Sequence, residues 1–244
     1  MPRPRLLFGA ATAVAVLVIG AVLVATGVVW PGRLFAAGHD VRGVDVSSYQ
    51  GEIDWPVLAE QDIDFAWIKA TEGSSTVDPR FAANWAGATR TGLLVGAYHF
   101  LSFDSPGETQ ADNVIATVPT DGTLPIAIDV EYYGSYVDDP PPAERVRAIL
   151  TPLLDRLRAH YGVAPVLYAT AAAYDRYLAG AYPDDPIWIR SVVLPPRLSD
   201  GRDWTIWQYS PRDRLPGYRG EERFIDLNVS ALSRDELAAL ARPR

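Results

Sequence analysis

Four acidic residues lie in or just after short apolar runs, where they could gather in one cleft. They are Asp45 in the run 41–46, Asp129 and Glu131 at the end of the run 124–130, and Asp226 in the run 224–227. Like charges in one cleft resist joint ionisation, so one member of such a cluster can keep its proton at neutral pH. A protonated carboxylic acid beside an ionised one is what hydrolysis of a glycosidic bond requires. The alternative is that each acid caps a turn or a helix.

The spacing of these acids adds to the hypothesis. Asp129 and Glu131 are two residues apart, so on a strand they point to one face with backbones about 6.6 Å apart. Carboxylate pairs of glycosidases lie about 5 to 9.5 Å apart, which this pair fits without choosing between a retaining and an inverting outcome. Asp45 and Asp226 end the first and last predicted strands, which are neighbours in a closed barrel. We expect them to lie close together.

Aromatic residues occur in the same regions of the chain. Rings at strand ends can stack on the apolar faces of sugars. We assign Trp67 and Trp204 to the core. We expect His99 to be a strand-end histidine with satisfied hydrogen bonds rather than a donor to a carboxylate. The side chains predicted to line the cleft are Tyr49, Tyr98, Tyr168 and Trp207.

Eight apolar runs supply the strands that must position these residues. Runs that are hydrophobic at nearly every position suit strands buried on both faces, as in parallel sheets. The runs are residues 41–46, 65–70, 93–100, 124–130, 164–169, 187–189, 204–209 and 224–227.

Helical signals separate most of these runs. They are residues 79–90, a segment capped by Asp104 or Ser105, residues 143–161 before Gly162, and a capping box from Ser233 to Glu236. The alternation predicts an α/β fold, an irregular (β/α) barrel of TIM type, with an open doubly wound sheet as the competitor. The connection 188–204 is too short and Pro-rich for a full helix. We therefore expect an incomplete helical ring.

The N-terminal part of the chain is different, because residues 6–32 contain no charged side chain and are flanked by Arg3, Arg5 and Arg33. A membrane-spanning helix needs about 20 such residues, whereas the apolar part of a cleaved signal peptide has about 7 to 15. We expect residues 1–38 to form a short cytoplasmic tail, one transmembrane signal-anchor and a linker. We expect residues 39–244 to form the barrel, outside the cell and held at its membrane. Secretion after cleavage is the alternative.

Composition excludes several other classes. The 244 residues carry a net charge of −8 and no cysteine, which argues against a nucleic-acid partner and rules out thiolate metal sites. The three histidines, His39, His99 and His160, show no zinc-ligand spacing, although carboxylates alone could hold a hard cation. No dinucleotide-binding or phosphate-binding glycine loop occurs. We expect no cofactor and no bound metal.

Several segments together resemble the family 25 glycoside hydrolases, the N-acetylmuramidase type of lysozyme. They occur in the order GVDVSSYQG (43–51), IDW (53–55), FAWIKATEG (65–73), GAYHF (96–100), DVE (129–131), LY (167–168), WQYS (207–210) and DLN (226–228). The resemblance implies an irregular (β/α) barrel that cleaves the β-1,4 bond between N-acetylmuramic acid and N-acetylglucosamine in peptidoglycan. Lys69 in this pattern is the chain's only lysine.

The resemblance also implies roles for the residues. Glu131 would be the general acid, Asp129 would orient the substrate's N-acetyl group in substrate-assisted catalysis, and Asp45 and Asp226 would hold sugar hydroxyls. Gln208 would join the aromatic residues in binding substrate.

One departure from the family pattern lies after Trp188, where Arg190 and Val192 replace a small residue and a tyrosine. An inward Arg190 could pair with a substrate carboxylate, but we favour an outward, solvated side chain. Two other functions stay open: a non-catalytic module that binds wall glycan, and a glycosidase for another polysaccharide.

Overall fold

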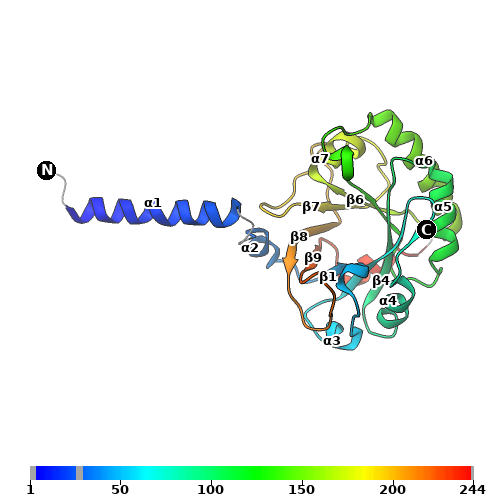
Figure 1. The fold of residues 1–244 in the computed structure, drawn as a ribbon, viewed down its shortest axis with the longest axis horizontal. Helices are drawn as coiled ribbons and strands as arrows, with labels where there is room; N and C mark the ends of the chain where they lie inside the picture. The colour runs from blue at the N-terminus through cyan, green and yellow to red at the C-terminus, as the bar shows by residue number, and fades with distance from the viewer. Residues whose placement is uncertain (1–3, 26–29, 243–244) are drawn as a thin grey trace.

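The strands of the computed structural model, which describes residues 4–25 and 30–242, form a closed barrel (Figure 1). They are β1 (Arg42–Val46), β2 (Phe65–Glu72), β3 (Thr76–Val77), β4 (Leu94–Phe100), β5 (Ala127–Val130), β6 (Val166–Thr170), β7 (Ile187–Arg190), β8 (Ile206–Asp213) and β9 (Ile225–Ser230). Their order is β1-β9-β8-β7-β6-β5-β4-β2-β3, and a β1–β2 pairing closes the barrel. All eight predicted strands are present. The two-residue β3, which pairs with β2 outside the barrel, was not predicted.

Strand β9 runs against its two neighbours, whereas the other barrel strands are parallel to one another. The prediction that Asp226 ends its strand is therefore wrong, because Asp226 is the second residue of β9. The reversed direction nevertheless brings the start of β9 to the rim where the parallel strands end. Asp226 lies directly opposite Asp45 in the antiparallel ladder, as the closed barrel predicted.

Alternation along the strands separates the barrel interior from the layer beneath the helices. Phe65 and Trp67 of β2 pack inside the barrel with Trp188, whereas Ile68 belongs to the outer layer. Gly96 of β4 leaves room for the interior rings, because a Cβ there would lie 2.6 Å from Trp67 Nε1. The predicted core position of Trp67 is confirmed by its complete burial.

Helices cover part of the barrel. They are α3 (Trp55–Ala59), α4 (Phe81–Ala88), α5 (Gly107–Thr117), α6 (Ala143–Tyr161), α7 (Ala171–Ala173) and α8 (Arg234–Ala239), with 3₁₀ turns at Ser48–Gln50 and Gly134–Val137 and a π turn at Tyr174–Leu178. Within the described chain no helix lies between β7 and β8 or between β8 and β9. The helical ring is incomplete, as predicted.

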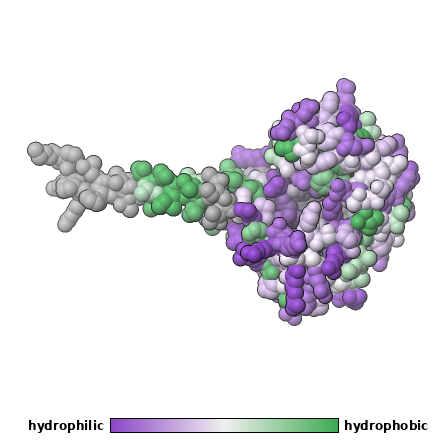
Figure 2. All heavy atoms as spheres, viewed as in Figure 1, coloured by the Kyte–Doolittle hydropathy of each residue, from purple (hydrophilic) through white to green (hydrophobic). Residues whose placement is uncertain are grey.

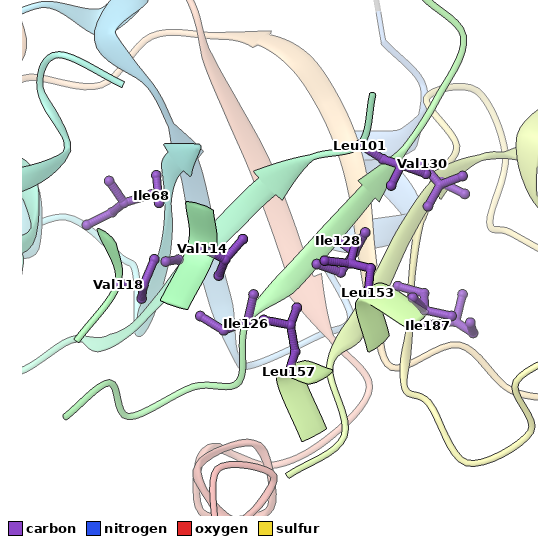
Figure 3. Close-up of a cluster of buried hydrophobic side chains, with 14 of the residues drawn as sticks. Ile68, Leu101, Val114, Val118, Ile126, Ile128, Val130, Leu153, Leu157 and Ile187 are labelled. Atoms are coloured by element: carbon purple, nitrogen blue, oxygen red, sulfur yellow. The ribbon is translucent and has the colours of Figure 1, made fainter. Parts of the chain in front are cut away.

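The largest hydrophobic layer lies between α5, α6 and the strands. Figure 3 shows Val114 of α5 and Leu153 of α6 facing Ile128 of β5, and all three are buried. Helix α6 ends at Gly162, whose φ of 75° is left-handed and whose N–H donates to the Arg158 carbonyl at 2.9 Å.

The predicted capping of two other helices has different outcomes. The Ser233–Glu236 capping box at α8 is confirmed. The prediction that Asp104 or Ser105 caps α5 is wrong, because the N-cap is Pro106 and no side chain caps it. The Asp104 carboxylate instead accepts hydrogen bonds from the hydroxyls of Tyr133 and Tyr136.

The short helix α2 (Gly32–Ala36) packs on the outer face of β8, although the sequence analysis placed it in a linker. Arg33 Nε donates to Asp213 Oδ2 at 2.8 Å, and Ala36 is buried against Trp207. Gly32 approaches so closely that a Cβ would lie 2.6 Å from the Tyr209 carbonyl oxygen. Residues before position 38 therefore contribute to the wall of the barrel that no other helix covers.

The N-terminal helix α1 (Pro4–Ala25) stands apart from the barrel in Figure 1. Its described side chains are apolar and largely exposed, as the green surface in Figure 2 shows; Leu17 is 72% exposed. Across residues 4–25 and 30–242, none of the helices has the length and apolarity that a membrane span requires. The predicted transmembrane segment is thus not supported by the structure.

Candidate active site

A cavity of about 300 Å³ opens at the rim where the parallel strands end. Every second residue of a strand points into the barrel, and the last inward residues line this cavity. On β2, for example, Phe65 and Trp67 fill the interior, and Lys69 on the same face lines the cavity above them. Eight of the nine predicted site residues line the cavity: Asp45, Tyr49, Tyr98, Asp129, Glu131, Tyr168, Gln208 and Asp226. The four predicted acids therefore lie in one site.

Asp45 and Asp226 lie directly opposite each other on β1 and β9 and influence each other's pKa. Asp45 Oδ2 accepts from Gln208 Nε2 at 2.9 Å and from Asn228 Nδ2 at 2.8 Å. Burial raises the pKa of both acids, but these amide donors stabilise the Asp45 carboxylate, whereas the neighbouring Asp45 raises the pKa of Asp226 further. The two environments therefore favour the carboxylate form more at Asp45 than at Asp226.

Asp129 and Glu131 share the inner face of the barrel, as their spacing predicted. Asp129 is 9% exposed, and its Oδ1 has no hydrogen-bond partner among the described residues. Burial and then the Glu131 charge raise the pKa of Asp129 well above its ordinary range. Burial also raises the pKa of Glu131, while Arg190 lowers it. Burial and like charge both favour a proton retained within this pair, which supplies an acid beside a carboxylate.

Aromatic side chains surround the acids. Tyr98 and Tyr168 line the cavity, and burial raises the pKa of both well above 10, so both remain neutral phenols. Tyr168 donates to Gln208 Oε1 at 3.0 Å, which orients the Gln208 amide toward Asp45. Tyr49 is 72% exposed at the mouth, where it is free to contact a ligand.

Trp207 does not line the cavity, which corrects the prediction that it contacts substrate. It is fully buried on the outer face of β8, and its Nε1–H donates to the Ser191 carbonyl at 2.6 Å. The physical reason is strand alternation: because Gln208 points into the barrel, Trp207 must point out. The ring is covered by Ala36 of α2.

Arg190 also differs from the orientation we favoured. It follows Trp188 by two residues on β7 and pairs in register with Gln208 of β8, so it shares their inner face. Its positive charge lowers the pKa of Asp45 and Glu131, in agreement with this inner-face position beside the acids. The outward orientation is wrong.

Several cavity residues were not identified from the sequence. Trp188 lines the cavity and its Nε1–H donates to Asn228 Oδ1 at 2.8 Å, which fixes the amide that holds Asp45. Phe100 and Phe224 supply further apolar wall. Alternation from Tyr98 would have predicted an inward Phe100, since the two residues are two apart on one strand.

His99 is a satisfied strand-end histidine, as predicted. Its Nδ1 lies 2.8 Å from the Thr71 hydroxyl and its Nε2 lies 2.9 Å from Gln110 Oε1. The amide oxygen only accepts, so Nε2 carries the proton and Nδ1 accepts from Thr71. Burial lowers the pKa of His99 to about 4. The ring is neutral and faces α5 rather than the acids.

The site shows no arrangement for a metal: within residues 4–25 and 30–242, no group of three or more His, Cys, Asp or Glu side chains is placed to hold an ion.

A barrel with a cavity at its C-terminal rim, buried paired carboxylates and aromatic walls defines the class of a barrel glycoside hydrolase. Residues 44–218 match the model of the family described as Glycosyl hydrolases family 25. The chain belongs to this family, which the sequence resemblance predicted.

Relatives with known names and structures agree with this assignment. Lysozyme M1 of Streptomyces globisporus is 32% identical over 218 residues, which cover 82% of this chain and 71% of that protein. The structure of a family 25 glycosyl hydrolase from Bacillus anthracis superposes with a TM-score of 0.79 at 50% identity, covering 84% of this chain and 94% of that one. The bacterial lysozyme from Streptomyces coelicolor superposes with a TM-score of 0.73 at 32% identity, covering 84% and 98%.

Proposed function

We propose that this protein is a peptidoglycan hydrolase of the lysozyme type, which cleaves the β-1,4 bond between N-acetylmuramic acid and N-acetylglucosamine. The observation that carries the proposal is the pair of buried Asp129 and half-buried Glu131 on the wall of an open cavity, both with raised pKa values. Family membership and the lysozymes among the similar proteins support the same reaction.

In the proposed mechanism, Glu131 donates its proton to the oxygen of the leaving sugar as the glycosidic bond breaks. Asp129, as a carboxylate, orients the N-acetyl group of the sugar that develops positive charge, and water completes the hydrolysis. The Asp45–Asp226 pair would hydrogen-bond sugar hydroxyls, because burial raises the pKa of both acids and favours a protonated carboxyl beside a carboxylate. Tyr49, Tyr98 and Tyr168 would supply the apolar and polar contacts to the rings.

A non-catalytic glycan-binding module is the second candidate. A binding site gains little from buried carboxylates that raise one another's pKa, because neutral hydrogen-bonding groups would hold sugar hydroxyls at a lower cost of burial. The unpartnered Oδ1 of Asp129 therefore favours catalysis over simple binding.

Mass spectrometry of a peptidoglycan digest tests the proposal. We expect fragments with N-acetylmuramic acid at the new reducing ends. New reducing ends of N-acetylglucosamine would assign the enzyme to the other glycosidic bond and contradict the proposal. Binding to the wall with no fragments would indicate the glycan-binding module, and release of sugars only from another polysaccharide would indicate a different glycosidase.

We further propose that the N-terminal segment attaches the barrel to the outer face of the cell membrane. The uncharged residues 6–32 and the preceding Arg3 and Arg5 support this location, as do the exposed apolar side chains of α1. All 30 acidic residues follow position 38, so the barrel gains little electrostatic attraction to an anionic wall. Attachment would supply a high local concentration instead.

Cell fractionation tests this location. We expect the full-length chain to sediment with membranes and to keep its N-terminal residues. Recovery from the medium with a new N-terminus near residue 38 would instead show cleavage and secretion.

A further inference from the structure

Arg190, next to the cavity at the end of β7, has no role in the proposed mechanism. It is the last residue of β7 and lies beside Thr170 of β6 and Gln208 of β8 in the parallel register. Trp188, two residues earlier, lines the cavity. The guanidinium group is therefore carried on the inner face of the barrel, at the edge of the acid cluster.

The partners of Arg190 differ from those of the other cation in the site. Lys69 Nζ lies 2.7 Å from Glu72 Oε2, so its charge is paired with a carboxylate of the protein. Across the described residues, the Arg190 side chain forms neither an ion pair nor a hydrogen bond with another residue. Its charge is nevertheless close enough to lower the pKa of Glu131. An arginine that served only to fix these acids would be expected to form a bidentate pair with one of them.

The rest of the rim would repel an anionic ligand. Five carboxyl groups line the cavity, the four predicted acids and Glu222, and the hydrogen bonds of Asp45 are directed to protein amides. A half-buried guanidinium with free N–H donors is the group best suited to a planar carboxylate, because its fork matches the two oxygens.

We propose that Arg190 binds a carboxylate of the glycan substrate and so makes the enzyme prefer chains that carry muramic acid over neutral chains. This inference rests on the proposed function. Two parts of peptidoglycan present a carboxylate: the free lactyl group of a muramic acid without a stem peptide, and the stem peptide where one is attached. The guanidinium chemistry is the same for both, so the experiment must separate them.

Binding measurements in the full-length Glu131→Gln background provide the test, because this variant should retain ligand. Three probes are compared: stem-free glycan oligomers with free lactyl carboxylates, the same oligomers converted to methylamides, and stem-bearing oligomers. We expect Arg190→Gln to weaken binding of its carboxylate probe by about 10- to 100-fold, the usual effect of losing a charged hydrogen bond. The loss for the methylamide should be at least tenfold smaller. Arg197→Gln, on the exposed loop after β7, removes the same charge and should leave the affinity for all three probes unchanged.

The pattern across the probes decides the outcome. A loss confined to the stem-free carboxylate assigns the lactyl group, and a loss confined to stem-bearing oligomers assigns the stem. An equal loss on the carboxylate and methylamide probes would overturn the proposal, as would unchanged affinity for every probe. Hydrolysis of intact wall by the wild-type chain is measured separately. Its absence would contradict the proposed function, whereas hydrolysis together with unchanged Arg190→Gln binding would contradict only this inference.

Discussion

The two faces of strand β8 show how differently the cavity and the outer wall use the same types of residue. On the inner face, Gln208 donates to Asp45 beside open space. On the outer face, Trp207 is fully buried under α2, and Asp213 at the end of the strand is paired with Arg33. Neighbouring residues of one strand therefore contribute to a reactive site and to a closed packing layer.

The comparison is clearest for buried acids. Asp213 is 6% exposed and is held by a guanidinium group, whereas Asp129 is 9% exposed and lies among other carboxyl groups with one oxygen unpartnered. An ion pair fixes a buried acid in its charged form, while burial among like charges favours a proton held within the Asp129–Glu131 pair. The neighbours of an acid, rather than its burial alone, therefore determine whether its site can hold a proton for acid catalysis.

The largest effect that this comparison predicts is the loss of activity in Glu131→Gln. Removing a general acid should lower kcat by about 10²- to 10⁴-fold, while the free energy of unfolding should not fall, because a half-buried ionisable group is replaced by a neutral one. Reducing-sugar release and chemical denaturation measure the two quantities. Glu221→Gln, at an exposed position outside the cavity, is the matched control. If Glu131→Gln kept wild-type kcat, Glu131 could not be the acid.

The next largest effect concerns Trp207 on the outer face. Trp207→Ala should lower the free energy of unfolding by about 3–5 kcal/mol, because it empties a fully buried site. The KM of the remaining folded enzyme should change little. Tyr49→Ala should show the opposite pattern, because Tyr49 is exposed at the mouth of the cavity. A raised KM with unchanged stability in Trp207→Ala would place this ring in the site after all.

The pH dependence of stability should separate His99 from the rim acids. The pKa of His99 falls from 6.5 to about 4 on folding, so its contribution is complete above pH 6.5 and is lost as the pH falls towards 4. The loss amounts to about 3 kcal/mol. The raised pKa of Asp226 has the reverse sign: its contribution is present in acid and is lost as the pH rises through its folded-state pKa.

Denaturation curves across pH test these signs. His99→Gln should flatten the fall in stability between pH 6.5 and 4, and Asp226→Asn should flatten the fall on the alkaline side. The slope is the measured quantity, because either substitution can also change stability at every pH. The same slope in wild type and His99→Gln would contradict the buried neutral histidine.

Most of the fold followed from the sequence because apolar runs and caps are local signals. All eight barrel strands, the end of α6 at Gly162 and the capping box at Ser233 were predicted correctly. The direction of β9 was not, because an apolar run carries no direction. The absence of a helical pattern between residues 213 and 225 was the available signal, since an antiparallel neighbour needs no crossover helix.

The site was predicted less completely, since its geometry depends on which face each strand residue occupies. The motif that contains Gln208 also suggested Trp207, yet only one of two adjacent strand residues can point inward. The same alternation from Trp188 would have placed Arg190 inside. The amide of Asn228 that holds Asp45 is a contact between strands, and no local pattern predicts it.

The smallest predicted effect tests whether the outer wall and the cavity are independent. The Arg33 side chain is 53% exposed and the side chain of its partner Asp213 only 8%, so Arg33→Gln should lower stability by about 1–2 kcal/mol, because the buried Asp213 loses a charged partner while the glutamine amide can still donate a hydrogen bond. It should leave kcat and KM unchanged, since Arg33 contacts the side of β8 that faces away from Gln208. Combined with Tyr49→Ala, its effect on stability should add. A fall in kcat, or a stability loss above about 2 kcal/mol, would show that α2 controls the position of β8 and therefore of the Gln208 amide that holds Asp45.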